Sequence, residues 1–249
     1  MNTSLHISKS GLNGLQKNLD IISNNIANVN TTGYKKKDGS FQELLLNDLQ
    51  QESVPLANNA DAAINRGTKV IQDQVNFTQG GLVKGQNPYD LAIEGQGFFA
   101  VRNRNNELLL TRDGAFAMDE NRDLRLSTGE RLELNEVIPK GQWPEGELKI
   151  TSSKEVMVGG QVVARLPIFS VAREGELIPV GQNRFALPAG LQLQELQDSK
   201  VHQGFLETSN VDLAGAMTDM IVTQRSYSLN AKVLQATDDM MQRINEYQQ

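Results

Sequence analysis

Three segments of the sequence carry residue types that could bind a ligand or a metal, and the first is a pair of closely spaced glycines. Residues 95–100 read Gly-Gln-Gly-Phe-Phe-Ala, which has the G-x-G-x-x-A spacing of a dinucleotide-binding loop. That loop needs a helix directly after it, because the helix N-terminus holds the pyrophosphate. Residues 98–102 have the apolar, non-periodic pattern of a strand instead. We therefore expect a glycine-bearing turn within a sheet.

The second segment, residues 119–130, resembles a calcium-binding loop. Oxygen-bearing side chains stand at positions 1, 3, 5, 9 and 12 of such a loop, namely Asp119, Asn121, Asp123, Ser127 and Glu130. Position 6 needs glycine for a sharp turn and is Leu124 here, and the flanking segments lack a helical pattern. We expect a β-hairpin that turns between Asp119 and Asp123.

The third candidate is the pair of histidines, His6 and His202, which lie in different terminal regions. Two imidazoles without a third ligand make a poor metal site, and the chain has no cysteine. The G-x-S-x-G nucleophile motif is absent, and no spacing of acidic residues singles out a general acid and base. The sequence predicts no catalytic residue, metal or cofactor, and hence a protein that is not an enzyme.

Charge and hydropathy narrow the range of partners. The net charge of −6 argues against nucleic-acid binding, which needs a positive surface. The cluster Lys35, Lys36 and Lys37 is smaller than the membrane-binding clusters of about 4–8 basic residues and predicts a solvated face. No apolar stretch approaches the roughly 20 residues that cross a bilayer, and the N-terminus lacks the features of a secretory signal. We expect a chain that does not span a membrane and is not exported with cleavage of its N-terminus.

The residues up to about 29 carry the heptad pattern of one amphipathic helix. Two series recur every seven residues, and they comprise Leu5, Leu12, Leu19 and Ile26 with the companions Leu15, Ile22 and Val29. Gly33, just beyond, suits the left-handed residue that ends a helix. The sequence therefore predicts a helix with one apolar face.

The C-terminal segment repeats this pattern. The same spacing relates Leu213, Met220, Tyr227, Leu234 and Met241, and the stripe is widened by Met217, Ile221, Ala231 and Ile244. Ser209, with Asp212 three residues later, resembles a capping box, and Asp212 suits the positive end of the helix dipole. Gly215 costs about 1 kcal/mol against alanine in a helix, so we expect fraying there.

The segment between about residues 70 and 205 lacks helical periodicity. Short apolar runs separated by Gly, Pro, Asn and Asp predict short strands, at residues 90–94, 97–101, 124–126 and 165–171. Residues 45–68 are polar without a clear period and predict an extended linker, or a segment that orders on assembly. We expect an α+β chain in three parts, namely a helix and linker at 1–69, a β-rich domain at 70–204 and a helix at 205–249.

Each end of the chain has an apolar stripe without a local partner, and two arrangements would cover it. The end helices could pair as a coiled coil and leave any remaining stripe for neighbouring subunits. Alternatively, both could dock on the β-rich domain. Exposing several leucines costs many kcal/mol at about 25 cal/mol per Å2, so one of the two is required, but periodicity alone favours neither.

Three longer motifs resemble those of the flagellar rod and hook protein family. Residues 22–35 (ISNNIANVNTTGYK) resemble its N-terminal signature. Residues 206–214 (LETSNVDLA) and 220–227 (MIVTQRSY) resemble its C-terminal signature. Residues 90–99 (DLAIEGQGFF), followed by 111–116 (TRDGAF), resemble the segment that opens the β-domain of these proteins. The motifs occur in the family's order at both ends and in the middle.

Within this family the sequence is most similar to the distal-rod members, at residues 5–12 and at Gly67 to Val70. Hook proteins resemble it at the ends but carry more sequence between the motifs. Gly215 departs from the family, which usually has an acidic residue there. The alternatives are a proximal-rod or minor rod homologue, a module that binds peptidoglycan or a ring protein, and a wall hydrolase, for which the chain has no spare length.

The resemblance implies a subunit that the flagellar type III export machinery exports unfolded and that polymerises helically into the hollow drive shaft between motor and hook. It implies a discontinuous inner domain of paired terminal coiled-coil helices and an outer, all-β domain. The implied partners are copies of the chain, other rod subunits and the hook protein, with ring proteins or peptidoglycan as further candidates. The implied location is the basal body outside the cytoplasmic membrane, in the periplasm or cell-wall zone.

We therefore expect function to lie in interfaces. The expected seam packs one apolar series on another, and it consists of Leu5, Leu12, Leu15, Leu19, Ile22 and Ile26 with Leu213, Met217, Met220, Tyr227, Leu234 and Met241. Asn24, Asn25 and Asn28 are candidates for hydrogen bonds between subunits, or they only solvate the end of the helix. Repeated copies must use head-to-tail contacts, because a symmetric patch closes into a dimer.

Overall fold

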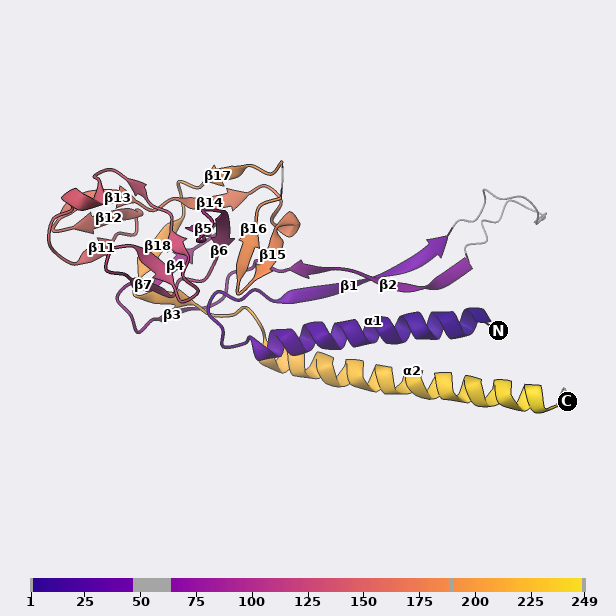
Figure 1. The fold of residues 1–249 in the computed structure, drawn as a ribbon. Helices are drawn as coiled ribbons and strands as arrows, with labels where there is room; N and C mark the ends of the chain where they lie inside the picture. Colours follow the sequence, from indigo (N-terminus) through magenta and orange to yellow (C-terminus); the bar gives the residue numbers. More distant parts are fainter. Residues whose placement is uncertain (1, 47–63, 189, 248–249) are drawn as a thin grey trace. The chain divides into compact units, whose positions relative to one another are not determined.

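The computed structural model describes residues 2–46, 64–188 and 190–247, which form a mixed α+β chain with a central β-rich region (Figure 1). The chain divides into two compact units. The helical unit comprises residues 1–27, 37–74 and 212–249, and the β unit comprises residues 28–36 and 75–211. Each unit is therefore assembled from segments far apart in the sequence.

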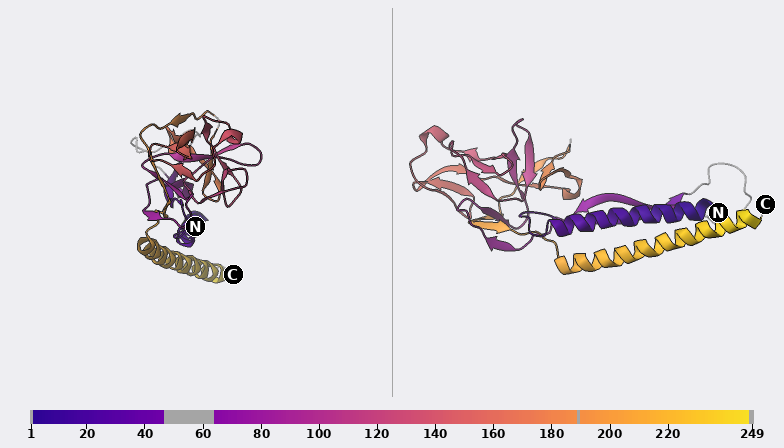
Figure 2. Two further views of the ribbon diagram at one scale, coloured as in Figure 1. Left: turned by 90° about the vertical axis from the view of Figure 1, so that its left-hand side faces the viewer. Right: turned by 60° about the horizontal axis from the view of Figure 1, so that its bottom comes forward.

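The helical unit contains both long helices and a two-stranded sheet. Helix α1 spans Asn2–Ala27 and helix α2 spans Leu213–Tyr247, while strands β1 (Lys37–Leu46) and β2 (Ile64–Val75) pair with each other. Helices α1 and α2 lie side by side, and β1 also lies against α1 (Figure 2). Both α2 and β1 therefore contact α1 within the described part of the unit.

Two expectations at the end of the first helix have different outcomes. The helix ends at Ala27, two residues before the expected end. Gly33 is left-handed, with a φ of 65°, but it lies in a later turn and does not cap the helix. Its N–H donates to the carbonyl of Glu207 at 2.9 Å, and a Cβ on it would lie 2.5 Å from the backbone nitrogen of Asp113. Glycine is required there by close packing within the β unit.

Paired strands occupy both ends of the segment expected to be an extended linker. Strand β1 ends at Leu46 and β2 begins at Ile64, and residues 47–63 lie outside the described part of the chain. A two-stranded ribbon satisfies backbone hydrogen bonds by pairing alone, so it needs no alternating apolar face. The sequence pattern therefore did not predict β1 and β2, because neither strand needs an apolar periodicity.

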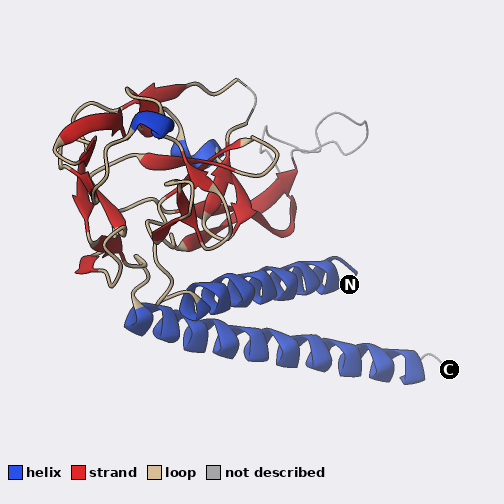
Figure 3. Ribbon diagram, turned by 60° about the vertical axis from the view of Figure 1, so that its left-hand side comes forward, coloured by secondary structure: helices blue, strands red, loops and turns tan. Residues whose placement is uncertain are grey.

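The β unit is built mostly of short strands, as Figure 3 shows in red. Its first strands are β3 (Leu82–Lys84), β4 (Leu91–Glu94), β5 (Phe98–Arg102), β6 (Leu108–Thr111), β7 (Phe116–Met118), β8 (Leu124–Leu126), β9 (Arg131–Leu132) and β10 (Asn135–Glu136). The later strands are β11 (Leu148–Ile150), β12 (Glu155–Val158), β13 (Gln161–Arg165), β14 (Ile168–Val171), β15 (Ile178–Gly181), β16 (Arg184–Ala186), β17 (Leu193–Glu195), β18 (Lys200–Gln203) and β19 (Phe205–Glu207). Two short 3-10 helices, η1 (Lys140–Gln142) and η2 (Glu174–Glu176), interrupt them.

The strands of the β unit form several sheets. The largest follows the order β15-β16-β6-β5-β9-β8-β7, with β14 paired to both β5 and β17. A second sheet has the order β10-β13-β12-β11, and two small sheets pair β18 with β4 and β19 with β3. The neighbouring strands of these sheets run antiparallel.

Strand β5 lies between the two hydrophobic cores of the β unit. Phe99 and Val101 pack into the first core, which also contains Phe116, Leu124, Leu132 and Val156. Phe98 and Ala100 pack into the second, which also contains Leu110, Val171 and Phe185. Because both faces of β5 are buried, its sequence is a continuous apolar run. The strands expected at 90–94, 97–101 and 124–126 are confirmed as β4, β5 and β8, whereas the run 165–171 holds the last residue of β13 and the whole of β14.

Within the described residues, neither long helix contains a stretch apolar enough to cross a lipid bilayer.

Candidate functional site

The apolar residues expected on the first helix are covered only in part within one chain. Ile22 is buried, whereas Leu12, Leu15, Leu19 and Ile26 are half-buried. The side chain of Leu5 lies outside the described part of the structure. The stripe therefore has one fully buried member in the described region and several that retain exposed surface.

A second face of α1 holds strand β1. Ile21 is buried, and a Cβ at Gly39 of β1 would lie 2.9 Å from its Cδ1, so glycine at this position makes room for the isoleucine. The side chain of Asn25 donates to the carbonyl of Lys37 at 2.8 Å and accepts from the N–H of Lys37 at 2.9 Å. Asn25 therefore fastens β1 to α1. The heptad pattern did not indicate this face because Asn25 is polar and Ile21 stands outside the a and d positions.

The other two asparagines of this group lie closer to solvent. Asn24 is exposed, and Asn28 is half-buried and accepts a hydrogen bond from the hydroxyl of Thr31 at 3.2 Å. Asn25, which was also a candidate for hydrogen bonds between subunits, uses both its amide nitrogen and its amide oxygen inside the chain.

The face of α2 next to α1 combines apolar and polar residues. Met220 and Leu234, which were expected in the seam, are half-buried, and Thr223 is buried. The side-chain amide of Asn18 donates to the hydroxyl of Thr223 at 3.4 Å. Thr223 lies three residues after Met220, a spacing that keeps it on the same face. It was missed because only apolar residues were counted.

Helix α2 also carries large apolar side chains that remain exposed. They range from 36% to 63% exposed, and they are Leu213, Met217, Ile221, Val222, Tyr227, Leu229, Val233 and Met240. Leu213, Met217 and Tyr227 were expected in the seam and are exposed in the single chain. The side chain of Met241 lies outside the described residues.

Four of these exposed residues share one face of the helix. Val222, Leu229, Val233 and Met240 follow intervals of seven, four and seven residues, and we call them the outer stripe. At 3.6 residues per turn they fall on a different face from Met220 and Leu234. The sequence pattern missed the outer stripe because a single heptad series was assigned to the helix.

The first residue of α2 is set by Asp212 and not by the expected capping box at Ser209. The carboxylate of Asp212 accepts a hydrogen bond from the N–H of Ala214 at 3.1 Å, which is the geometry of an N-cap. Ser209 instead accepts from the N–H of Val211 at 3.3 Å, two residues further on. Helix α2 therefore begins at Leu213, and Gly215 lies within it.

The β unit contains a buried charge cluster centred on Glu207. Its carboxylate accepts from Nζ of Lys35 at 2.5 Å, from Nη1 of Arg112 at 3.1 Å and from the N–H of Gly80 at 2.9 Å. The side chains of all three charged residues are at most 3% exposed. Lys35 also donates to the carbonyl of Thr78 at 2.8 Å. Such a group of buried charges requires mutual pairing to offset the cost of desolvation.

Lys35 was expected on a solvated face, and the structure corrects this. Burial lowers the pKa of Lys35, and the neighbouring Glu207 carboxylate opposes that effect by raising it. The cluster joins residues from the three motifs on which the family resemblance was based, because Lys35, Arg112 and Glu207 each belong to a different one. A charged residue within each motif was the available signal, but spacing alone could not show that they meet.

Two of the three segments with ligand-binding residue types fold as expected, namely the glycine pair at residues 95–97 and the segment 119–130. Gly95 and Gly97 have φ angles of 100° and 118° and form a turn between β4 and β5, so a strand follows them. Strands β7 and β8 pair as an antiparallel hairpin. At its turn, the carboxylate of Asp119 accepts from the backbone N–H groups of Asn121 and Asp123.

Within the described residues, no group of three or more His, Asp or Glu side chains could hold a metal ion. His202 pairs with Glu94 at 2.7 Å on the surface, and hydrogen bonding to His202 lowers the pKa of Glu94. His6 has no described side chain. The exposed apolar side chains of α2 suit packing between chains. The buried charge cluster suits a rigid β unit.

Comparison with known proteins matches three regions of the chain to family models. Residues 5–35 match the flagella basal body rod protein model, and residues 92–164 match the flagellar hook protein FlgE/F/G D1 domain. Residues 202–246 match the flagellar basal body rod FlgEFG protein C-terminal model. These regions overlap all three motifs and contain Lys35, Arg112 and Glu207 of the buried charge cluster.

Full-length relatives show similarity along the whole chain. The flagellar basal-body rod protein FlgG of Agrobacterium fabrum is 36% identical, over 95% of this chain and 96% of its own length. FlgG of Borreliella burgdorferi is 32% identical over 97% of both chains. The flagellar hook-basal body complex protein FlhP of Bacillus subtilis is 31% identical over 97% of this chain and 98% of its own. The chain belongs to the family of flagellar basal-body rod proteins and within it is most similar to FlgG.

Proposed function

We propose that the helical unit is the polymerising part of this rod subunit and that the outer stripe of α2 packs against further copies of the chain. The chain is a structural subunit of the flagellar basal-body rod. The observation that carries the proposal is the exposure of Val222, Leu229, Val233 and Met240 along one face of a long helix. A continuous apolar face on a soluble helix marks an interaction surface.

Helices α1 and α2 of one chain pair as a coiled coil and form the inner domain. The half-buried Leu19 and Leu234 and the hydrogen bond from Asn18 to Thr223 support this pairing. The heptad spacing of the predicted seam suits knobs-into-holes packing. Leu5 and Met241 extend the seam in this proposal.

The area left exposed sets how the subunits assemble. Completing the burial of a half-exposed Val, Leu or Met contributes about 1 kcal/mol. One stripe thus contributes only a few kcal/mol, whereas association of two proteins costs roughly 4–15 kcal/mol. A single pair of copies is therefore unstable, and a subunit within the rod needs several neighbours at once. Assembly is cooperative, and dilute subunits are monomeric.

The contacts between copies are head-to-tail, because a self-complementary patch would close into a dimer and stop growth. Growth by such contacts gives a helical, hollow rod that transmits torque between motor and hook. Leu213, Met217 and Tyr227 lie on exposed parts of α2 and join these contacts. Asn24, which is exposed, is a candidate for polar contacts at the same interface, and Asn28 is a second one.

The β unit forms the outer layer of the rod in this proposal, and the helical unit forms the inner one. The type III export machinery delivers the chain unfolded to the growing tip, outside the cytoplasmic membrane. Cooperative folding on assembly fits such delivery, because a helical unit whose described residues bury few side chains opens easily in a free subunit. Other rod subunits and the hook protein are the axial partners.

A matched pair of substitutions tests the outer stripe. Val233 on α2 is 56% exposed and Val137 on the β unit is 62% exposed, so Val233→Asp and Val137→Asp change the same residue type at similar exposure. We expect Val233→Asp to abolish rod polymerisation, measured by sedimentation and electron microscopy, and Val137→Asp to leave it intact. Equal polymerisation of the two variants would refute the role of the outer stripe.

Substitutions in the seam test the pairing of the helices. Leu19→Asp and Leu234→Asp each place a charge in the half-buried contact between α1 and α2, so we expect both to block polymerisation and motility. The circular dichroism of the β unit should not change. Normal motility of either variant would exclude the seam.

A further inference from the structure

We propose that the β unit binds a phosphate group in a hollow lined by arginines at the edge formed by β5, β8 and β9. The hollow has a volume of about 190 Å3. Its cationic lining comprises Arg102, Arg104, Arg125 and Arg131, with Asn103 and Asn106 beside them. This site does not depend on the polymerisation surface proposed above.

The sheet brings three of these arginines together in one row. Strand β9 lies between β5 and β8, and Arg131 of β9 is paired in register with Arg102 on one side and Arg125 on the other. Residues directly opposite one another point to the same face of a sheet, and like charges in this position are destabilising. Leu132, the neighbour of Arg131, is buried in the first core, so Arg131 lies on the opposite face.

Carboxylates compensate two of the arginines. Glu133 accepts from Nε of Arg102 at 2.6 Å and from Nη2 at 3.1 Å. Asp119 accepts from Nε of Arg125 at 2.6 Å. These contacts fix the guanidinium groups of Arg102 and Arg125 at the wall of the hollow.

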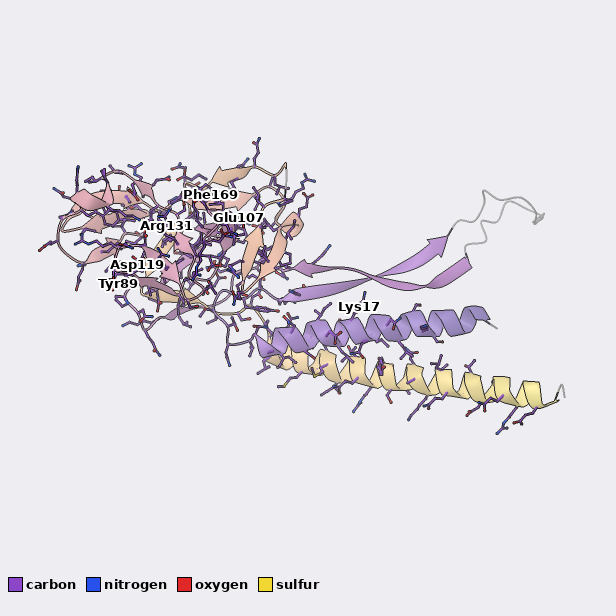
Figure 4. All side chains as sticks on the ribbon, in the orientation of Figure 1. Lys17, Tyr89, Glu107, Asp119, Arg131 and Phe169 are labelled. Atoms are coloured by element: carbon purple, nitrogen blue, oxygen red, sulfur yellow. The ribbon has the colours of Figure 1, made fainter. Side chains whose placement is uncertain are left out.

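The remaining two arginines lack a carboxylate of their own. The nearest carboxylate of Arg131 is Asp123 at 3.9 Å, which also lies 3.6 Å from Arg125 and pairs more closely with Lys140. Within the described residues, Arg104 forms no ion pair. Figure 4 labels Arg131 and Asp119 among the side chains of the β unit. The hollow therefore retains an excess of positive charge in a chain whose net charge is −6.

The loop that carries Arg104 is held in place. The side chain of Asn103 accepts from the N–H groups of Asn105 at 2.9 Å and Glu107 at 3.0 Å. Arg102 donates to the carbonyl of Asn106 at 3.2 Å, and Asn106 has a left-handed φ of 62°. A fixed loop loses little conformational entropy when a ligand binds.

Charge and volume select the ligand class. A phosphate monoester carries about −1.5 to −2 charges near neutral pH. That charge suits Arg104, which has no ion pair within the described residues, together with Arg131, which shares Asp123 with Arg125 and Lys140, better than the single charge of a carboxylate does. Guanidinium forks bind phosphate oxygens in a bidentate manner. The hollow is smaller than the roughly 300–1,000 Å3 of sites for drug-sized molecules. It therefore takes one phosphate group, either free or carried on a larger molecule.

Titration of the full-length chain tests this site. Inorganic phosphate, glucose 6-phosphate, glucose and acetate are titrated separately and followed by nuclear magnetic resonance. We expect both phosphates to shift the same amides around Arg104 and Arg131 in a saturable way, and glucose and acetate to bind far more weakly. Tighter binding of glucose 6-phosphate indicates a phosphate carried on a larger molecule, and tighter binding of inorganic phosphate indicates the free ion.

Variants connect the binding to these side chains. Arg104 has no ion pair to lose in the described structure, so Arg104→Gln should fold normally. It should weaken phosphate binding about tenfold, because one charge-assisted hydrogen bond to the phosphate is lost. Arg131→Gln should have an effect of similar size. The control is Arg173→Gln, which removes an exposed ion pair with Glu176 outside the hollow. Absence of saturable phosphate binding, acetate binding as tight as phosphate, or equal affinities of the chain and Arg104→Gln would overturn the proposal.

Discussion

The two units of this chain bury apolar surface to very different extents. In the β unit, strand β5 alone buries Phe98, Phe99, Ala100 and Val101 between two cores. In the helical unit, the fully buried apolar side chains of the described residues are Ile21 and Ile22, while α2 exposes a whole stripe. We therefore expect the β unit to be stable within one chain and the helical unit, as proposed above, to complete its core against neighbouring copies.

The buried polar groups differ in the same way. The β unit encloses Lys35, Arg112 and Glu207, which are paired with one another. Among the described residues of the helical unit, the buried polar side chains are the neutral Asn25 and Thr223. Buried charges demand a rigid surrounding, because motion would leave them unpaired. A charge cluster therefore suits a unit that is folded before assembly, and neutral polar contacts suit one that orders during it.

The largest expected difference between the units is in amide hydrogen exchange. Opening of the core strands should require the global free energy of unfolding, of about 5–15 kcal/mol, whereas opening of α1 in a monomer should cost little. We expect amides of Phe98 to Val101 to exchange slower than those of residues 12–27 by several orders of magnitude in dilute solution. In the polymer the amides of α1 should become protected. Strong protection of residues 5–29 in the dilute monomer would contradict this comparison.

The next effect concerns the charge cluster. Glu207→Gln keeps the size of the side chain but leaves Lys35 and Arg112 buried without a negative partner. We expect the free energy of unfolding to fall by about 3–5 kcal/mol, measured by urea denaturation of the monomer.

A control for this variant is Glu176→Gln, which removes an exposed ion pair with Arg173. Exposed pairs contribute about 0–1 kcal/mol, so this variant should unfold almost as the parent chain does. Similar destabilisation by both substitutions would mean that the buried cluster is not what stabilises the β unit.

Much of the fold could be predicted from local patterns. The apolar runs and the Gly and Asp turns located β4, β5 and β8, because both signals are local in sequence. The paired strands β1 and β2 could not be predicted, since their stability comes from pairing across a long separation and not from periodicity. The sequence correctly indicated a left-handed backbone at Gly33. The reason that glycine is needed there is close packing against Asp113, which is far away in the sequence.

The candidate site could be predicted from the sequence only through its apolar residues. Heptad spacing singled out Met220 and Leu234, which are half-buried, whereas Thr223 and Asn25 form contacts that a count of apolar residues cannot detect. Lys35 looked like a solvated residue because its partner Glu207, which also pairs with Arg112, is far away in the sequence. Long-range charge pairing therefore requires the structure.

The smallest effect expected is the pH dependence due to Asp113 in the β unit. Burial raises the pKa of Asp113 above its ordinary value of 3.8, although hydrogen bonds from Ala115 and Thr32 oppose the shift. A carboxyl whose pKa is higher in the folded state stabilises the fold below pH 3.8, and this stabilisation is lost as the pH rises through the folded pKa. Asp113→Asn keeps an acceptor for Thr32 and removes the charge, so the decline in unfolding free energy from pH 3.8 to neutral pH should become shallower. Urea denaturation between pH 3.8 and neutral pH measures how the unfolding free energy changes with pH. The control is Asp198→Asn, because Asp198 is exposed. The same pH dependence in Asp113→Asn and in the parent chain would show that burial of Asp113 does not affect the stability of the β unit.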